Sequence, residues 1–553
     1  MSETTASRRS WLWIFAVFLV LLTIAVYLRS LGNDFVAWDD GLLILENPII
    51  RGPTIRNIVL AFTSYDPELY IPLTFLSYQL NYLVGGLHPF GYHLVNLLLH
   101  VANALLVAWV VSLLSKRPWA ALVAGILFAI HPLHTEAVAW ASARKDVLMT
   151  FFFLLSVGMY LRSHESDDRR WSIGSVIMFL FALLSKVSVI VLPGILILHR
   201  WRERRPFDRA FVMRLLPYLC LSIAFGVIAL FGKRGNASLL IEKILIGAKG
   251  SLFYLQKLFL PWGFSVFYPY TDPIAFSTPD LALALIVIAI LTALACLSRW
   301  WLRGNRDVSF GWGWYLLLLL PTFTNFAKGK DVLLDVYFAS DRYAYAASIG
   351  ILFLIGLFFD ALHRRLPWLM RGILAFFVIC LTFLSYRQSL VWRNSETLFS
   401  NVIAWYPNAH TAHNNLGSLY AQRGDLKRAA QEYQASLAIR PNGAAYFNLG
   451  QLYMMLQLPD RAVGMYRAAL TQNPNDRDAA VNLGVILLER GDVVGAIEIL
   501  EHAREVDGRF APTFYNLGLA YERAGRQEEA MTAYRKAVEL DPGSPAREKL
   551  SNE

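Results

Sequence analysis

Two adjacent carboxylates, Asp39 and Asp40, stand just after the first hydrophobic segment of this chain and could act as a general base. That segment, Trp11 to Leu31, has the ~20 residues that a helix needs to cross a bilayer. Arg8 and Arg9 precede it, so the positive-inside rule places its N-terminus in the cytoplasm. We therefore expect the acidic pair at the external surface, where a carboxylate could deprotonate an acceptor brought to a lipid-borne donor.

The two acids are not expected to be equivalent. Neighbouring side chains in extended backbone point to opposite sides, so only one of them should face an acceptor, and Asp40 is slightly favoured over Asp39. Two other roles stay open. The pair could cap the helix that follows, because carboxylates stabilise helix N-termini, or it could bind a metal ion.

Three further groups of ionisable residues are predicted on the same external side. Ionisable residues at membrane depth are expensive and usually mark a pathway or a site. The candidate site residues in these groups are His131, His134, Glu136, Arg144, Asp146, Lys186, Asp341, Arg342 and Tyr343.

Each of these groups also has a structural interpretation. The two histidines could hold a metal ion at His-x-x-His spacing, or they could close a hydrogen-bonded turn with Pro132 between two spans. Arg144 and Asp146 could simply pair with each other. Asp341 and Arg342 could anchor a span at the membrane interface.

The composition is that of a polytopic membrane protein. Of 553 residues, 56% are hydrophobic and only 17% are charged. The formal charge of +10 comes largely from short basic clusters between apolar runs, as cytoplasmic loops require, which argues against nucleic-acid binding. The three cysteines all lie in apolar segments, which excludes a disulfide or metal framework.

The apolar runs predict eleven crossings, which leaves the C-terminal half outside. The loops around Asp40, His131, Lys186, Lys233 and Asp331 would be external. Residues 244–260 are the weak point and are interpreted as interfacial or re-entrant. The spans expected after the first are 89–114, 119–130, 147–161, 171–184, 187–199, 211–231, 281–297, 312–326, 343–362 and 369–386.

The last third of the chain is an internal repeat. The triplet Asn-Leu-Gly recurs at steps of 33, 34 and 34 residues, beginning at Asn415, Asn448, Asn482 and Asn516. Small residues such as Gly417 and Ala429 would let two helices approach closely, and Pro441, Pro474, Gly508 and Pro542 end the units. This pattern resembles the tetratricopeptide repeat over about residues 407–541, with a half-repeat at 396–405 before it. The four asparagines could secure their own helix pairs, or could line a groove that binds an extended acceptor peptide.

The external clusters together resemble the GT-C superfamily of membrane glycosyltransferases. More closely, they resemble the protein O-mannosyltransferase family that combines transmembrane spans with tetratricopeptide repeats. Val187 departs from the family pattern, which often has an acid after the lysine at position 186. The resemblance rests on Asp39-Asp40, Asn47-Pro48, residues 72–74, Asn81-Tyr82, residues 86–94, the 131–138 segment, Asp341-Arg342-Tyr343 and the repeats.

The resemblance implies transfer of a sugar, mannose-like, from a polyprenyl phosphate to a Ser or Thr hydroxyl on the external face, with inversion. Asp40 or Asp39 would be the base, and the candidate residues of the three ionisable groups would bind the donor phosphate or the acceptor. The histidine cluster and basic residues would hold the lipid phosphate, for which arginine is favoured because its planar fork binds two oxygens together. No cofactor is certain, and a divalent metal is possible. The expected partners are the polyprenyl-phosphate donor, an acceptor protein or peptide in the repeat groove, and membrane lipids.

The sequence thus predicts an all-α protein with two domains. Residues 1–390 form a GT-C-like helical bundle of about eleven spans, and residues 391–553 form a tetratricopeptide α-solenoid of four repeats with a leading half-repeat. The predicted location is a bacterial inner membrane with periplasmic repeats, with the endoplasmic reticulum as the alternative. The rival function is a non-catalytic membrane scaffold or assembly factor that displays the repeats.

Overall fold

The computed structural model describes residues 2–65, 69–166, 168–232, 240–302, 304–324 and 336–551, and these residues are almost entirely helical. They divide into two compact units. The described residues up to Asn401 form the membrane unit, and those from Val402 onward form the repeat unit. The boundary lies after the predicted one, because residues 391–401 pack with the helical bundle.

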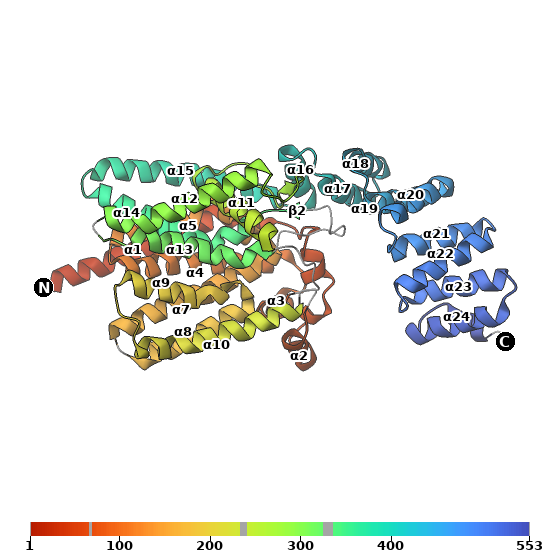
Figure 1. The fold of residues 1–553 in the computed structure, drawn as a ribbon, viewed down its shortest axis with the longest axis horizontal. Helices are drawn as coiled ribbons and strands as arrows, with labels where there is room; N and C mark the ends of the chain where they lie inside the picture. The colour runs from red at the N-terminus through yellow and green to blue at the C-terminus, as the bar shows by residue number, and fades with distance from the viewer. Residues whose placement is uncertain are drawn as a thin grey trace. The chain divides into compact units, whose positions relative to one another are not determined.

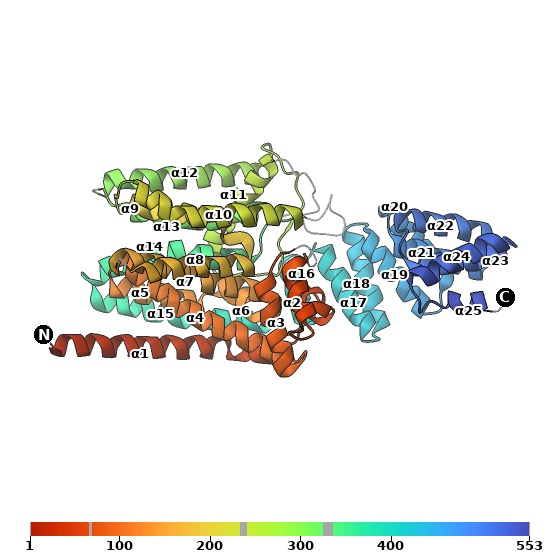
Figure 2. The same ribbon diagram turned by 90° about the horizontal axis from the view of Figure 1, so that it is seen from below.

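The membrane unit is a bundle in which the long helices run side by side (Figures 1 and 2). Its α-helices are α1 (Ser2–Tyr27), α2 (Ile55–Thr63), α3 (Pro72–Gly85), α4 (Pro89–Ser115), α5 (Pro118–Ile130), α6 (Thr135–Ala139), α7 (Arg144–Ser166), α8 (Arg169–Ser185), α9 (Leu192–Arg202), α10 (Arg209–Gly232), α11 (Leu240–Phe259), α12 (Pro279–Trp301), α13 (Asp307–Leu319), α14 (Ala344–His363) and α15 (Pro367–Val391).

Short elements connect these helices. The sequence did not predict the small antiparallel sheet, in which Pro269 of β1 (Pro269–Tyr270) pairs with Tyr337 of β2 (Val336–Tyr337). The short elements are η1 (Leu28–Gly32), the π-helical turn η2 (Gly41–Leu45), η3 (Pro48–Ile50), η4 (Pro132–His134), η5 (Ala141–Ala143), η6 (Val187–Val191), β1 (Pro269–Tyr270), η7 (Leu320–Thr324), β2 (Val336–Tyr337) and η8 (Asp341–Tyr343).

The predicted spans all coincide with helices, but not all are long enough to cross alone. Within the described ranges, seven helices are long and apolar enough to span a membrane, or eight if the bent pair Pro118–Ile130 and Pro132–Ala139 counts as one. Three of the eleven predicted spans correspond to α8, α9 and α13, which have 17, 11 and 13 residues and are shorter than the 18 residues required of a candidate span. The amphipathic helix α11 is not among the candidate spans. Lys233 and Asp331, predicted in external loops, lie outside the described residues.

The chain between α1 and α4 carries the acidic pair and folds into a small core of its own. Leu43, Ile50 and Phe75 are buried in it together. Asn47 caps η3 by accepting the Ile49 N–H at 2.9 Å. The side chain of Gln79 on α3 donates to the Ile49 carbonyl at 2.9 Å. Apolar burial and these polar ties therefore give the segment that follows the acids a defined position.

The repeat unit consists of helix pairs with the predicted 34-residue spacing. The predicted close approach is confirmed, because a Cβ added at Gly417 would lie 2.7 Å from the Tyr433 ring of its partner helix. The second helix of each pair ends two residues before the predicted terminator, as α18 does before Pro441. The helices are α16 (Ser395–Trp405), which begins in the membrane unit, α17 (His410–Gln422), α18 (Leu426–Ile439), α19 (Gly443–Met455), α20 (Pro459–Gln472), α21 (Arg477–Glu489), α22 (Val493–Val506), α23 (Ala511–Arg523), α24 (Gln527–Leu540) and α25 (Ala546–Ser551).

Candidate active site

Asp40 is completely buried and holds its own loop in place. Its Oδ2 accepts the Val36 N–H at 2.8 Å, and its Oδ1 accepts the Ser142 N–H at 3.0 Å and the Ser142 hydroxyl at 2.5 Å. Burial raises the pKa of Asp40 from 3.8 to about 6, while these hydrogen bonds oppose that rise. Asp40 precedes η2 but makes no capping hydrogen bond with its side chain, so the capping interpretation is wrong for this residue.

Asp39 is the accessible member of the pair. Its side chain is 36% exposed, and its Oδ2 lies 3.7 Å from Nζ of Lys145, whose side chain is only 4% exposed. The two acids lie in a turn, with Asp40 in helical backbone, and not in the extended chain that the sequence suggested. They nevertheless differ in environment, since one carboxylate is enclosed and the other reaches the surface.

A second ion pair joins the start of α7 to the end of α8. Nζ of Lys186 donates to Oδ1 of Asp146 at 2.5 Å, with both side chains largely buried. Nζ of Lys186 also lies over the Tyr343 ring, 5.3 Å from its centroid, which is within cation–π range. The alternative in which Arg144 pairs with Asp146 is therefore wrong, because Asp146 pairs with Lys186.

Asp341 and Arg342, at the start of α14, join the same site. Arg342 pairs with Oε1 of Glu136, and the backbone N–H of Asp341 donates to Oε2 of Glu136 at 2.9 Å. The hydroxyl of Tyr268 donates to Oδ1 of Asp341 at 2.7 Å. Glu136 thus ties the histidine-rich segment to the start of α14, which lies more than 200 residues later in the sequence.

Trp140 and Tyr343 link the ion pairs into one constellation. The guanidinium of Arg342 lies 4.8 Å from the Trp140 ring centroid and 5.0 Å from that of Tyr343. Nζ of Lys145 lies 5.5 Å from the Trp140 centroid. Around two aromatic rings, the site therefore gathers three cations, Lys145, Lys186 and Arg342. The same site holds the exposed carboxylate of Asp39.

Several polar atoms of this constellation have unused hydrogen-bonding capacity. Among the residues that the structure describes, no protein partner hydrogen-bonds Nζ of Lys145, Nε of Arg342, Nε1 of Trp140 or Oδ2 of Asp146. Buried polar groups are normally hydrogen-bonded, so unpaired donors concentrated in one place indicate a polar ligand or ordered water there. Two of these donors are cationic, which favours an anionic ligand.

The two predicted histidines occupy structural positions. Nδ1 of His131 accepts the Leu133 N–H at 3.1 Å and its Nε2 lies 2.9 Å from the Leu258 carbonyl. Nδ1 of His134 lies 2.8 Å from the Phe128 carbonyl and its Nε2 lies 2.9 Å from the Ser348 hydroxyl. All four ring nitrogens therefore have protein partners, which matches the hydrogen-bonded turn and leaves none for a metal ion or phosphate.

Arg144 bonds neutral groups and not the carboxylates of the ion pairs. It bonds the side chains of Asn96, Asn81 and Ser77 and the Tyr92 carbonyl, and it lies 5.2 Å from the Tyr78 ring centroid. All these partners are neutral and belong to α3 and α4. This geometry gives Arg144 a role in joining α7 to α3 and α4.

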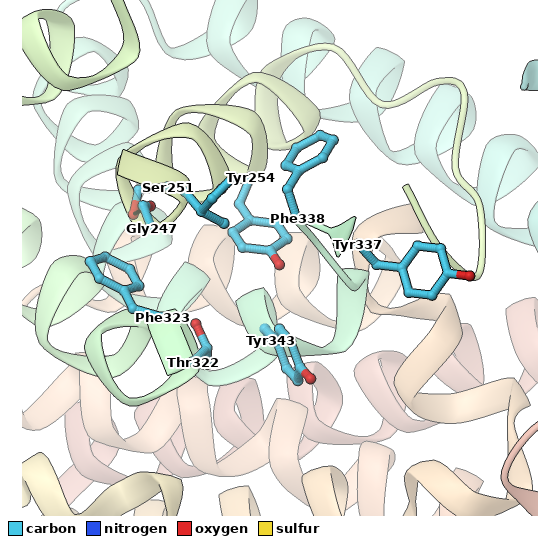
Figure 3. Close-up of a pocket in the computed structure, with 10 residues that line it drawn as sticks. Gly247, Ser251, Tyr254, Thr322, Phe323, Tyr337, Phe338 and Tyr343 are labelled. Carbon is cyan, nitrogen blue, oxygen red and sulfur yellow. Dashed lines mark hydrogen bonds between the residues drawn. The ribbon is translucent and has the colours of Figure 1, made fainter. Parts of the chain in front are cut away.

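An aromatic pocket adjoins the constellation at Tyr343 (Figure 3). In Figure 3, Tyr254 of α11, Phe323 of η7 and Tyr343 of η8 face a common space. The hydroxyl of Tyr254 accepts the Ser340 N–H at 2.9 Å, which fixes the ring beside the start of α14. The lining residues are Ile246, Gly247, Gly250, Ser251, Tyr254, Thr322, Phe323, Tyr337, Phe338 and Tyr343.

Across the described part of the chain, no three His, Cys, Asp or Glu side chains are placed to hold a metal ion. The sequence missed Lys145, Trp140 and Ser142 as site residues. The sequence could have indicated a role for Lys145 in the site, because it stands between two charged residues at a predicted membrane surface. No such indication exists for Trp140 and Ser142, because their roles depend on partners far away in the sequence.

The four repeat asparagines are half-buried at equivalent positions, but their contacts differ. Nδ2 of Asn448 donates to Oδ1 of Asn414 at 3.0 Å, one repeat away. Nδ2 of Asn482 donates to the Tyr466 hydroxyl at 3.4 Å, and Nδ2 of Asn516 donates to the Pro512 carbonyl of its own helix at 3.0 Å. The column therefore supports helix packing in part and leaves the groove role as a hypothesis.

Known proteins share both parts of this architecture. Models described as "Tetratricopeptide repeat" match residues 383–444, 447–512 and 511–544. The human protein named "Protein O-mannosyl-transferase TMTC4" is 25% identical, covering 74% of this chain and 64% of that protein. The Caenorhabditis elegans protein named "Protein O-mannosyl-transferase F38B6.6" is also 25% identical, covering 77% of this chain and 62% of that protein. The Drosophila melanogaster protein named "Protein O-mannosyl-transferase Tmtc2" is 38% identical over 32% of this chain and 20% of its own length.

These relatives confirm the predicted family resemblance, and the chain spans less than two thirds of the length of the first two. A solved structure titled "Crystal structure of YrrB: a TPR protein with an unusual peptide-binding site" aligns with 30% of this chain and 84% of its own. Its identity is 23% and its TM-score is 0.26, which is too low to add to the assignment.

Proposed function

Because this chain is a homologue of proteins named protein O-mannosyl-transferase, we propose that it is a membrane O-mannosyltransferase of the GT-C type. The donor is a polyprenyl-phosphate sugar, and the acceptor is a Ser or Thr hydroxyl of a protein on the external face. One observation carries the proposal most directly. The partly exposed carboxylate of Asp39 lies beside a group of buried cations, and two of these, Lys145 and Arg342, have nitrogen atoms that no described protein group hydrogen-bonds.

In the proposed reaction, Asp39 is the general base and Asp40 is a positioning residue. The acceptor hydroxyl oxygen attacks the anomeric carbon and its proton goes to Asp39. The bond between that carbon and the phosphate oxygen breaks on the opposite face, so the configuration inverts. Asp39 is preferred to Asp40 because Asp40 is completely buried and both of its carboxylate oxygens already accept hydrogen bonds, from Val36 and Ser142.

The leaving group is a polyprenyl phosphate that gains negative charge. Lys186 and Arg342, together with Lys145, are proposed to stabilise that charge. Nζ of Lys145 and Nε of Arg342, which no described protein group hydrogen-bonds, provide donors for it.

The repeat unit is proposed to bind the acceptor protein in an extended form, with Asn415, Asn448, Asn482 and Asn516 lining the groove. Sugar transfer is assigned to the membrane unit, up to Asn401, and acceptor recruitment to the repeat unit, from Val402 onward. The proposed location is a membrane with the N-terminus in the cytoplasm and the repeats outside. A bacterial inner membrane fits the low cysteine content and compact loops.

Sugar transfer by purified protein tests the proposal. The full chain in lipid vesicles would receive polyprenyl-phosphate mannose carrying a radioactive label, and a Ser/Thr-containing peptide. Labelled peptide with inverted anomeric configuration is the expected product. Peptide binding without any transfer would instead support the membrane scaffold.

A further inference from the structure

The segment from Trp392 to Phe399 connects α15 to the first turn of α16 and contacts the candidate site on two sides. It belongs to the membrane unit, although the tetratricopeptide match begins before it, at residue 383. The sequence alone assigned this part of the chain to acceptor recruitment. Its contacts indicate a different task.

On one side, the segment holds the acidic loop. The backbone N–H of Asp34 donates to the Arg393 carbonyl at 2.9 Å, and that of Ala37 donates to Oγ of Ser395 at 2.8 Å. The ring of Phe399 lies edge-on to that of Trp38, with centroids 6.5 Å apart. Asp39 follows directly after Trp38, so these contacts act on the backbone that carries the proposed base.

On the other side, the segment supports the cations. Trp392 stacks on Trp140 with a centroid distance of 5.5 Å and an interplanar angle of 21°, and both side chains are buried. The same Trp140 ring is contacted by Arg342 and Lys145. The position of Trp392 therefore influences the ring against which two of the three cations lie.

The segment itself is rigidly built. Oδ1 of Asn394 accepts the Thr397 N–H at 3.0 Å, and Oγ1 of Thr397 accepts the Asn394 N–H at 3.2 Å, which is the reciprocal arrangement of a capping box. Asn401, one turn further on, donates its side chain to the Phe264 carbonyl at 2.8 Å. A capped and anchored helix start can hold a loop in one position.

We propose that Ser395 and Trp392 are positioning residues for sugar transfer, so that the start of the repeat region completes the active site. Ser395 fixes the loop that carries Asp39, and Trp392 fixes the ring beneath Lys145 and Arg342. This inference rests on the proposed function. It adds that the base and the phosphate-binding cations are placed by one short segment, and that this segment acts in the chemical step and not in acceptor capture.

Ser395→Ala tests the proposal in the full chain. It removes the acceptor of the Ala37 N–H, which is worth roughly 0.5–1.5 kcal/mol, or about two- to twelvefold in an equilibrium or rate. Hydrogen exchange of the amides in residues 33–40 should quicken by this factor. The kcat for sugar transfer should fall by a similar factor, while the KM for acceptor peptide stays unchanged. Ser395→Thr, which keeps the acceptor oxygen, should restore both properties.

The matched control is Ser389→Ala. Ser389 is a buried serine one to two turns earlier, and its hydroxyl donates to the Tyr386 carbonyl of its own helix at 2.7 Å. Exchange in 33–40 and kcat should both remain at the wild-type values. Trp392→Phe gives the second arm and should raise the KM for donor because Trp140 loses part of its support.

The outcomes separate the two proposals. Unchanged exchange in Ser395→Ala would overturn the positioning role even if the protein transfers sugar. Faster exchange with unchanged kcat would overturn it as well, because the loop would then be held without consequence for chemistry. If the wild-type protein transfers no sugar, the proposed function fails, and the link from Ser395 to kcat is overturned with it.

Discussion

Ser142 donates its backbone N–H to Oδ1 of Asp40 at 3.0 Å, across 102 residues of sequence. This bond joins the loop after the first span to the turn before α7, where Lys145 and Asp146 begin the charged part of the site. The distance between the proposed base and its neighbouring cations is therefore set by a carboxylate that has no proposed catalytic contact itself. Five expected outcomes follow from this arrangement and from the repeats.

The first concerns Asp39. Asp39→Asn should lower kcat by about 10²–10⁴-fold, the usual contribution of a general base. Initial rates of sugar transfer measure this effect. Glu46→Gln removes an exposed acid of the same loop and serves as the control, so equal losses in both variants would argue against a specific base.

The second concerns pH and Asp40. The folded pKa of about 6 exceeds the ordinary value of 3.8, so between these values the folded protein holds more protons than the unfolded chain. Stability should therefore fall as pH rises from about 4 to 6, by roughly 3 kcal/mol from this group alone. Thermal unfolding in detergent across pH 4–7.5 should show this slope in the wild type and lose it in Asp40→Asn. A slope that survives in the variant would assign the effect to another group.

The third separates Arg144 from the cations that are proposed to bind phosphate. Arg144→Lys cannot bond all the neutral partners on α3 and α4, and each buried group left unpaired costs about 1–3 kcal/mol. The melting temperature of this variant should fall by roughly 1–4 °C for each group left unpaired, with the KM for donor little changed in the protein that remains folded. Arg342→Lys should mainly raise the KM for donor or lower kcat. The reverse pattern would exchange the two roles.

The fourth concerns the close helix contacts in the repeats. A Cβ at Gly450 would lie 2.7 Å from the Tyr466 ring, so Gly450→Ala should destabilise its repeat by about 1–3 kcal/mol. Gly464→Ala is the control, because no atom lies within 4 Å of its added Cβ, and it should stabilise α20 by up to about 1 kcal/mol. Limited proteolysis of the full chain would detect opposite changes in the two variants.

The fifth concerns the groove asparagines. The side chain of Asn516 donates to the Pro512 carbonyl of its own helix, so Asn516→Ala should cost little stability. Combined with Asn415→Ala, it should weaken capture of an extended peptide by about tenfold if each amide contributes one hydrogen bond, worth roughly 0.5–1.5 kcal/mol. Peptide affinity measured by fluorescence anisotropy gives the answer. Unchanged affinity would leave these side chains with a packing role.

The helices and repeats could be predicted because their signals are local. A run of apolar residues predicts a span, and the 34-residue recurrence of Gly417 and its equivalents predicts close helix pairs. The partners within the site could not be predicted in this way. Nothing local indicates that Arg144 turns to Asn96 while Asp146, two positions later, turns to Lys186. Those choices depend on how α7 is rotated against α3, α4 and α8, which only the packed bundle determines.

For a related reason, the sequence could not decide which of Asp39 and Asp40 is the proposed base. Two identical side chains in adjacent positions differ only in what encloses them, and Val36 and Ser142 enclose Asp40. For His131 and His134, the chemistry of the side chains suggested a ligand-binding role, but their hydrogen bonds show a structural one. Their chemistry suits ligand binding, yet the backbone turn at Pro132 uses the nitrogens of His131 and the neighbouring spans use those of His134.

Each crowded glycine of the repeats meets a side chain of its own helix pair: Gly417 meets Tyr433, Gly450 meets Tyr466, Gly484 meets Leu500 and Gly518 meets Tyr534. The close approach of the two helices of a pair is thus determined by residues within that pair. A gene could lose or duplicate one such block in frame and the remaining blocks would keep their internal geometry. The length of the array can therefore vary in whole repeats.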